Sequence, residues 1–202
     1  SCLFFFVLYN LFGEDAMIYL VNAGSESVNV VGGKAKRLGQ MISVGLPVKG
    51  GMVISTSEVD EILRCGRVST AMTDKISGFL NVDVVEFAVR SSAVDEDGAK
   101  SWAGQFRTEL FVNRNDLVRK VLDCALARDS DAVKAYAATS CTNCSALALV
   151  IQEMVRADTA GVLFTQDPRN GARGGVAVIE AVHGVGESLV SGKREPHRYY
   201  ID

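Results

Sequence analysis

Two glycines and a lysine form the clearest group of residues that could bind an anion. The run Gly32-Gly33-Lys34 follows Val30-Val31 and precedes an amphipathic stretch, so it is predicted to lie at a strand-to-helix turn. Glycine permits close approach to a ligand, a helix N-terminus offers free N–H groups, and lysine adds a positive charge for phosphate. The spacing differs from that of a P-loop, and the alternative interpretation is a solvated lysine.

A second basic side chain, Arg90, ends a strand-like apolar run and precedes two small hydroxyl residues, Ser91 and Ser92. A guanidinium at the mouth of a sheet can bind phosphate oxygens as a fork. The acidic residues 95–97 are close in sequence. Pairing of Arg90 with one of these carboxylates is therefore an equally good interpretation of the residues alone.

Three further segments carry groups suited to a nucleotide. Residues 101–108, SWAGQFRT, combine small residues with hydroxyls, and such a loop can fold over a triphosphate. Residues 152–155 end an apolar strand, where backbone groups can contact an adenine edge. The turn 184–187, GVGE, carries one carboxylate. A hairpin connection and a buried strand with polar ends are the ordinary alternatives for the first two.

The elements that must position these groups divide into an α+β part and a β-rich part, with a boundary near 140–148. Strand patterns in the first part lie at 18–21, 51–55, 82–89 and 108–112. Helix patterns there lie at 35–44, at 57–66 after a Ser57 cap, from Asn113 or Asn115 to about 128, and from 129 or 130 to 138. The second part has strand patterns at 147–155, 161–165, 176–182 and 198–201.

The composition limits the classes of function. The chain has 202 residues, of which 48% are hydrophobic and 22% charged, enough apolar material for a sizeable core. The net charge of −3 provides no overall basic field for binding nucleic acid. We therefore expect no nucleic-acid partner, although a local basic pocket for a small anion is compatible with this charge.

The cysteines indicate reduced thiols in a cytoplasmic protein. The chain has 5 cysteines, an odd number in a long chain, which is untypical of disulfide-stabilised secreted domains. Cys141 and Cys144 form a CxxC pair, and His183 and His197 are the only histidines that could complete a zinc site. Both are distant in sequence, so two ordinary thiols and no metal are expected.

Residues 1–16 begin with an almost wholly apolar run, SCLFFFVLYNLF. A membrane-spanning helix needs about 20 such residues, and a signal peptide needs a basic start and a small-residue cleavage site. We therefore expect no membrane association. Residues 1–16 either precede a true start at Met17 or form a buried N-terminal strand.

The order of these motifs strongly resembles the N-terminal nucleotide-binding domain of phosphoenolpyruvate synthases, over residues 17–202. The matching runs are VGGK, FAVRSSAVDED, SWAGQFRT, VIQEMV, AGVLFTQDP and HGVGESLVSG. Rifamycin phosphotransferases and pyruvate phosphate dikinases are related to that family. The resemblance implies an ATP-grasp fold, with a first lobe at 17–145 and the beginning of an incomplete, β-rich second lobe at 146–202.

The resemblance also implies roles for individual residues. Lys34 and Arg90 would hold the ATP phosphates, and Gly104 and Thr108 would lie in the loop that covers them. Glu187 would lie near the ribose or the phosphates. The adenine hinge would be formed by Gln152, Glu153, Met154 and Val155. The chain departs from the family pattern at Ala35, which replaces a glycine, at His183, and at His197, which replaces an aspartate.

The implied activity belongs to a larger enzyme. A phosphoenolpyruvate synthase converts ATP, pyruvate and water to AMP, phosphoenolpyruvate and phosphate through a phosphohistidine on a separate domain. We expect that domain, the pyruvate site and the Mg²⁺ ligands beyond residue 202, so this chain alone is expected to be inactive. The alternatives are part of a rifamycin phosphotransferase and a non-catalytic nucleotide-binding remnant.

Overall fold

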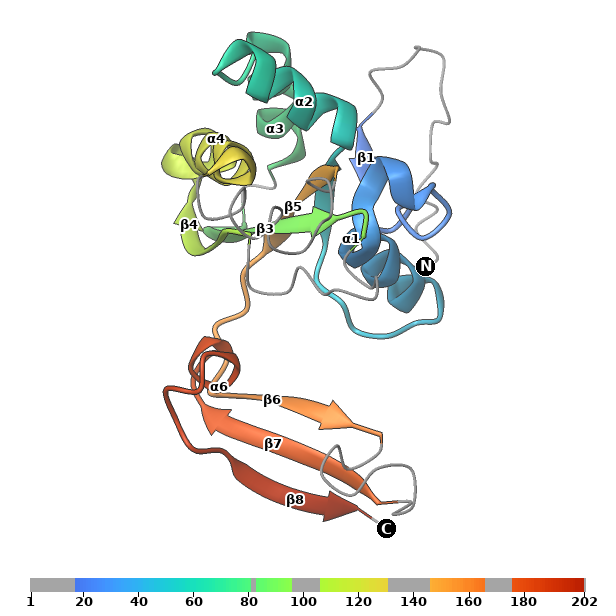
Figure 1. The fold of residues 1–202 in the computed structure, drawn as a ribbon, viewed down its shortest axis with the longest axis vertical. Helices are drawn as coiled ribbons and strands as arrows, with labels where there is room; N and C mark the ends of the chain where they lie inside the picture. The colour runs from blue at the N-terminus through green and yellow to red at the C-terminus, as the bar shows by residue number, and fades with distance from the viewer. Residues whose placement is uncertain (1–16, 81–82, 96–105, 131–145, 166–175, 202) are drawn as a thin grey trace. The chain divides into compact units, whose positions relative to one another are not determined.

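The apolar strands of the chain pair into two separate antiparallel sheets (Figure 1). The computed structural model describes residues 17–80, 83–95, 106–130, 146–165 and 176–201. The chain divides into two compact units, Ser1–Met154 and Val155–Asp202, and each unit contains one of the sheets. The fold is therefore a mixture of α and β structure in which the strands run antiparallel.

The first unit is built around β5, Leu147–Glu153, the central strand of a five-stranded sheet. The order across this sheet is β1 (Ile18–Tyr19), β2 (Gly51–Ile54), β5, β3 (Glu86–Ala93) and β4 (Thr108–Asn113). The β5 side chains from 147 to 151 are fully buried. Because successive side chains of a strand point to opposite faces, β5 contributes to two separate cores.

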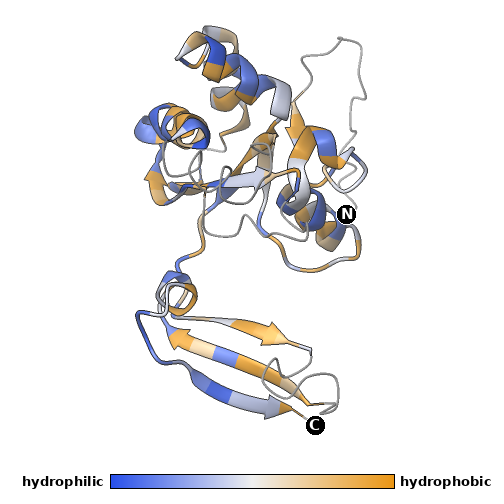
Figure 2. Ribbon diagram, viewed as in Figure 1, coloured by the Kyte–Doolittle hydropathy of each residue, from blue (hydrophilic) through white to orange (hydrophobic). Residues whose placement is uncertain are grey.

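Three helices cover one face of this sheet, namely α2 (Thr56–Cys65), α3 (Thr70–Phe79) and α4 (Leu117–Leu126). Their apolar sides pack on alternate residues of β3 and β5, including Phe87, Val89, Leu149 and Ile151. The opposite sides of these helices are polar. In Figure 2, α2 and α4 therefore each show both hydrophilic residues, in blue, and hydrophobic residues, in orange. This core also buries Cys124, and the burial raises the pKa of its thiol to about 12.

Helix α1, Val28–Ser43, covers the other face of the sheet. Its buried residues Val31 and Ala35 pack against Val53 of β2 and against Ala148 and Val150 of β5. The intervening residues of the same strands therefore face α1, and this second face carries the polar side chains of interest.

Side-chain caps define where two of the helices begin. Ser55 caps α2, and it forms a reciprocal capping box with Glu58, whereas the sequence predicted Ser57 as the cap. Gly66 ends α2 in the left-handed conformation, as predicted. Asn113 caps a short turn, η1 (Arg114–Asp116), that leads into α4; η2 (Ala127–Asp129) follows that helix. None of the helices described has the length and apolar character needed to cross a membrane.

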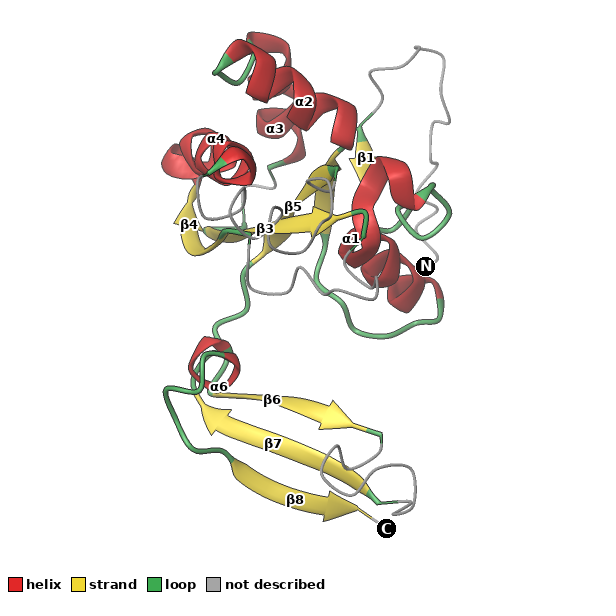
Figure 3. Ribbon diagram, viewed as in Figure 1, coloured by secondary structure: helices red, strands yellow, loops and turns green. Residues whose placement is uncertain are grey.

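The second unit is a three-stranded sheet in the order β6 (Thr159–Phe164), β7 (Ala177–His183) and β8 (His197–Ile201), drawn in yellow in Figure 3. A short helix, α6 (Glu187–Val190), lies between β7 and β8 in the chain. In the middle strand, the side chains of Val178 and Val182 are nearly fully buried.

Several observed elements differ from the predicted ones. Strand β3 extends to Ala93 because Arg90 to Ala93 pair with β5, although the sequence predicted a loop from residue 90. Helix α3 was not predicted, since its apolar pattern is interrupted by polar residues and Gly78. The units divide after Met154 rather than at 145–146, because β5 belongs to the first sheet. Residues 1–16 and most of the predicted helix ending at 138 lie outside the described residues.

An ion-pair cluster joins β4 to α4. The Glu109 carboxylate accepts a hydrogen bond from Arg107 Nε at 2.5 Å and lies 3.0 Å from Lys120 Nζ of α4. Burial of Glu109 opposes its ionisation, but hydrogen bonds from Lys120 and Arg107 outweigh burial and lower its pKa. The ionised carboxylate therefore stabilises the contact between the strand and the helix.

We expect Glu109→Gln to lower the free energy of unfolding by about 1 kcal/mol at neutral pH. A depressed pKa in the folded state means that this contribution is present above the unfolded pKa, about 4.3. It is lost as the pH falls through the folded value. Urea unfolding at a series of pH values measures the difference. Glu61→Gln, at an exposed position, is the control; an undiminished effect of Glu109→Gln in acid would contradict the prediction.

Candidate nucleotide-binding site

The predicted phosphate-binding side chains of the first unit share one face of its sheet. In the β-sheet register, Arg90 of β3 lies opposite Val150 of β5 on one side and opposite Thr108 of β4 on the other. Val150 belongs to the core beneath α1. Because residues directly opposite each other in a sheet share a face, Arg90 and Thr108 lie on the face that α1 covers in part. Gln152 has the same parity as Val150 and shares this face.

The glycine run lies at a kink within α1, not at a strand-to-helix turn as the sequence predicted. Val30 and Val31 are helical, because Ser27 caps this first turn by accepting a hydrogen bond from Asn29 N–H. Gly32 then adopts φ 74° and ψ 167°, which interrupts the helix. This conformation is essentially restricted to glycine. A new helical segment begins after Gly32 and carries Lys34.

Ser92 ties this kink to β3. Its hydroxyl donates to Val31 O at 2.9 Å and accepts from Ala35 N–H at 3.0 Å, and its side chain is fully buried. Ser92 thereby bridges the last carbonyl before the kink and an N–H of the helical turn after it. The backbones are so close that a Cβ on Gly32 would lie 2.0 Å from Ser92 O. Glycine at position 32 is therefore a steric requirement.

Lys34 lies at the start of the second helical segment, and its Nζ donates to the carbonyl of Ser91 at 2.6 Å. The side chain is half-buried against β3. In the sequence, Ser91 and Ser92 are the small hydroxyl residues that follow Arg90. In the structure both residues are buried, and the Ser92 hydroxyl is used in the bridge to α1.

Arg90 lies within β3 rather than at its end, because the strand continues to Ala93. Its guanidinium donates from Nη1 to Gln152 Oε1 of the neighbouring strand at 3.2 Å. Gln152 in turn donates from Nε2 to the carbonyl of Lys49 at 3.0 Å. The alternative pairing of Arg90 with Asp95, Glu96 or Asp97 stays a prediction; Asp95 is a described residue, whereas Glu96 and Asp97 lie outside the described part of the chain.

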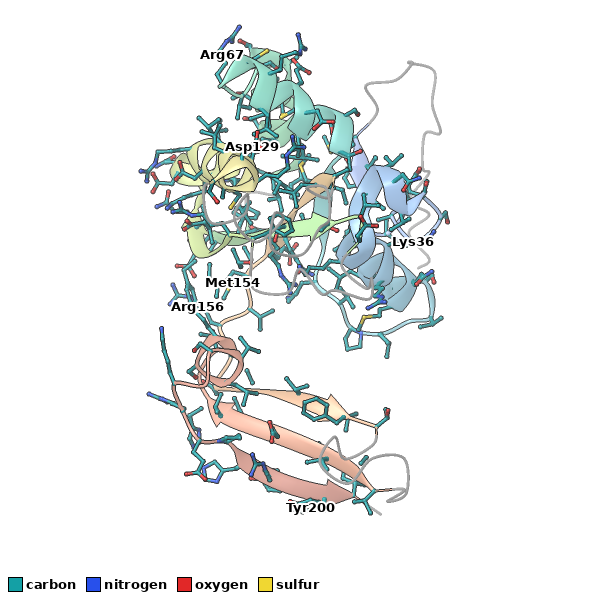
Figure 4. All side chains as sticks on the ribbon, in the orientation of Figure 1. Lys36, Arg67, Asp129, Met154, Arg156 and Tyr200 are labelled. Atoms are coloured by element: carbon teal, nitrogen blue, oxygen red, sulfur yellow. The ribbon has the colours of Figure 1, made fainter. Side chains whose placement is uncertain are left out.

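The predicted adenine hinge is anchored to the first unit up to Met154, labelled in Figure 4. Glu153 N–H donates to Gly50 O at 3.0 Å, and Met154 N–H donates to Glu86 O at 3.0 Å. The Glu153 carboxylate lies 3.9 Å from Lys49 Nζ. These two N–H groups are therefore already hydrogen-bonded to backbone carbonyls of the first unit. A base bound at this segment would therefore have to use other backbone groups.

Thr108 is exposed at the start of β4. Its neighbours Arg107 and Glu109 form an ion pair with each other, and Glu109 also contacts α4 on the opposite face of the sheet. Thr108 thus lies on the same face of the sheet as Arg90. Gly104, predicted to belong to the same phosphate-covering loop, lies outside the described residues.

Val155 and Glu187 belong to the second unit. Glu187 is exposed at the start of α6 and lines a hollow of about 460 Å³ together with His183, Ser188, Lys193 and Arg194. The wall of this hollow is held by Arg194 N–H, which donates to Ser188 O at 3.2 Å. Two cations and one carboxylate line it, a combination suited to a phosphate and a hydroxyl group.

The histidines of the second unit lie near each other, with ring centroids of His183 and His197 6.2 Å apart. Across the described ranges of the chain, no three His, Cys, Asp or Glu side chains come together as a metal site would require. Cys141 and Cys144, the predicted ordinary thiols, lie outside those ranges.

Sequence reasoning missed how Ser92, Gln152 and Lys49 position the two cations. One signal was available for Gln152, which is a polar residue directly after five apolar ones, in LALVIQE. A polar side chain in a central strand usually has a hydrogen-bond partner. No local signal pairs Gln152 with Lys49, since 103 residues separate them.

Comparison with known proteins identifies the nucleotide-binding family. The family described as "Pyruvate phosphate dikinase, AMP/ATP-binding domain" matches residues 71–202. That match includes Arg90, Thr108, the segment 152–155 and Glu187, whereas Lys34 precedes it. The family match therefore covers the second unit and the part of the first unit from residue 71 onward.

Curated relatives align over most of this chain. The prodigiosin synthesizing transferase PigC of Serratia marcescens is 34% identical over 198 residues, which cover 85% of this chain and 22% of that protein. A phosphoenolpyruvate synthase of Aeropyrum pernix is 28% identical, covering 92% of this chain and 28% of that protein. A rifampicin phosphotransferase of Bacillus cereus is 28% identical, covering 85% and 24% respectively. The chain thus spans about a quarter of the length of each relative.

We expect Gly32→Ala to lower the free energy of unfolding of the first unit by about 2–4 kcal/mol, because the added Cβ must displace the backbone of β3. Gly66→Ala is the matched control, since Gly66 also has positive φ (65°) but a Cβ added there would meet no atom within 4 Å. The control should lose only about 1 kcal/mol, the cost of a left-handed alanine. Equal losses in urea unfolding would contradict the close approach of α1 to β3.

Proposed function

Because this chain belongs to the family of pyruvate phosphate dikinase AMP/ATP-binding domains, we propose that Lys34, Arg90 and Thr108 bind the phosphates of ATP. The observation that carries this proposal is their common place on the α1 face of the first sheet. A lysine and an arginine supply the charges, and a threonine supplies a hydroxyl for a phosphate oxygen. Gly104 is proposed to act with Thr108.

We also propose nucleotide-binding roles for the segment 152–155 and for Glu187 of the second unit. The segment would serve the adenine through backbone groups other than the N–H groups of Glu153 and Met154, which are already bonded. Glu187 would contact the ribose or the phosphates, in keeping with the cations and the carboxylate that line its hollow. We propose that the two units are the first lobe and part of the second lobe of an ATP-grasp fold, which their antiparallel sheets support.

We propose that the complete protein is a phosphoenolpyruvate synthase. ATP and water would phosphorylate a histidine on a separate domain and release AMP and phosphate, and the phosphohistidine would then phosphorylate pyruvate. A relative of that name, aligned over 92% of this chain, supports this acceptor. The free thiols of Cys65 and Cys124 fit a reducing compartment such as the cytoplasm. The second candidate is a phosphotransferase for rifampicin, which the Bacillus cereus relative supports.

We expect Lys34→Ala and Arg90→Ala each to weaken ATP binding by about tenfold or more, because each removes a charge-assisted hydrogen bond to phosphate. Isothermal titration of the intact protein containing this chain measures the affinity. Circular dichroism should show an intact fold in both variants.

Two matched controls accompany these variants, Lys36→Ala and Arg67→Ala, at residues labelled in Figure 4. Lys36 Nζ donates to Glu26 O at 3.0 Å, and Arg67 is exposed beyond the end of α2. Neither belongs to the proposed site, so both should bind ATP as the wild type does. Unchanged affinity in both Lys34→Ala and Arg90→Ala would refute the proposed site.

The acceptor is tested by incubating the intact protein with ATP and Mg²⁺ and with either pyruvate or rifampicin. We expect AMP and phosphoenolpyruvate to form in equal amounts with pyruvate, because one ATP supplies one transferred phosphoryl group. Phosphorus NMR identifies both products. Phosphorylated rifampicin without phosphoenolpyruvate would favour the second candidate.

A further inference from the structure

Gln152 is a buried amide whose two ends are held by different parts of the first unit. Its side chain accepts from Arg90 Nη1 at 3.2 Å and donates to Lys49 O at 3.0 Å, and Gln152 is only 8% exposed. The chemistry determines which end is which, because a guanidinium can only donate and a carbonyl can only accept. The amide therefore connects β3 to the segment before β2 through β5.

This connection bears on Arg90 because a long side chain loses conformational freedom when it binds a ligand. An arginine that is already held in place has less freedom to lose, so it binds phosphate more tightly. Gln152 is well placed for this purpose because the Lys49 carbonyl orients its amide in turn. The hydrogen bond that Gln152 donates to Lys49 O thus keeps the amide oxygen oriented toward Arg90.

The type of acceptor is also significant. A carboxylate at position 152 would hold Arg90 as well, but it would offset the positive charge that attracts phosphate. The amide oxygen accepts the hydrogen bond while adding no net charge. Whatever else Arg90 contacts, the group supplied by β5 orients the guanidinium without neutralising it.

We propose that Gln152 is a positioning residue for Arg90 in phosphate binding, and that its side chain does not contact the adenine base. This proposal rests on the proposed function. The Gln152 side chain is thus assigned to Arg90, whereas the adenine contacts proposed for the segment 152–155 are made by backbone groups. The side chain lies on the sheet with its amide directed to Arg90 and to Lys49, so its polar ends serve the protein.

The test compares two ligands, ATP and adenosine, in Gln152→Leu and Gln152→Glu. If Gln152 acts through Arg90, both variants bind ATP about tenfold more weakly, the loss typical of a hydrogen bond to a charged group. Adenosine has no phosphates, so its affinity should stay within about twofold of wild type. Gln152→Glu keeps the size of the side chain and carries the test if Gln152→Leu does not fold, as judged by circular dichroism.

A double-mutant cycle provides the second readout. In an Arg90→Ala background, Gln152→Leu should weaken ATP binding by less than about twofold, because the group that it positions is gone. Gln40→Leu, at an exposed glutamine of α1, is the control and should bind both ligands normally. All titrations use the intact protein.

Three results would overturn the proposal. An equal loss of adenosine and ATP affinity would place Gln152 at the base. If Gln152→Leu weakened ATP binding about tenfold even in the Arg90→Ala background, Gln152 would not act through the arginine. Normal ATP binding by Gln152→Glu would show that a neutral acceptor is unnecessary. Failure of the proposed function is seen separately, as the absence of ATP binding by the wild type.

Discussion

The hydroxyl of Ser92 imposes the constraint on which the site depends. It bridges Val31 O and Ala35 N–H across the kink at Gly32, and all of these groups are buried. The bridge brings α1 so close to β3 that position 32 has no room for a side chain. Lys34, two residues after the kink, therefore starts from a backbone that is held against the sheet. Its ammonium reaches the carbonyl of Ser91 for this reason.

Half-buried cations of the first unit have carboxylates or neutral oxygens among their partners. Lys75 and Lys120 are held by carboxylates, at Glu58 and Glu109. The groups that hold Lys34 and Arg90 include a backbone carbonyl and an amide oxygen, which are neutral. An ion pair stabilises a fold, but it also reduces the attraction of its cation for an external anion. A neutral acceptor orients a cation without itself adding a negative charge, and Lys36, outside the proposed site, is held by a backbone carbonyl in the same way.

The local features of the sequence predicted more of the fold than of the contacts. Periodicity located β5 and the helix that ends at Gly66, because their apolar residues repeat with the strand and helix periods. The same reasoning misplaced the end of β3, since Ser91 and Ser92 are polar and only their pairing with β5 keeps them in the strand. It also assigned a strand to Val30-Val31, where the Ser27 cap and the Ser92 bridge favour helix. A contact between distant segments decided the first of these cases, and a local cap together with such a contact decided the second.

Because the net charge of the chain is negative, attraction for a polyphosphate depends on where the individual cations lie. A protein with a charge of −3 repels a polyphosphate at long range, so attraction must come from cations close to the bound anion. Carboxylates of the neighbouring strands are themselves paired: Glu109 contacts Arg107 and Lys120 on the opposite face of the sheet, and Glu153 lies near Lys49. These pairs offset the carboxylate charges at short range, where screening is weakest. Lys34 and Arg90 place two positive charges at the α1 face, although the chain as a whole is acidic.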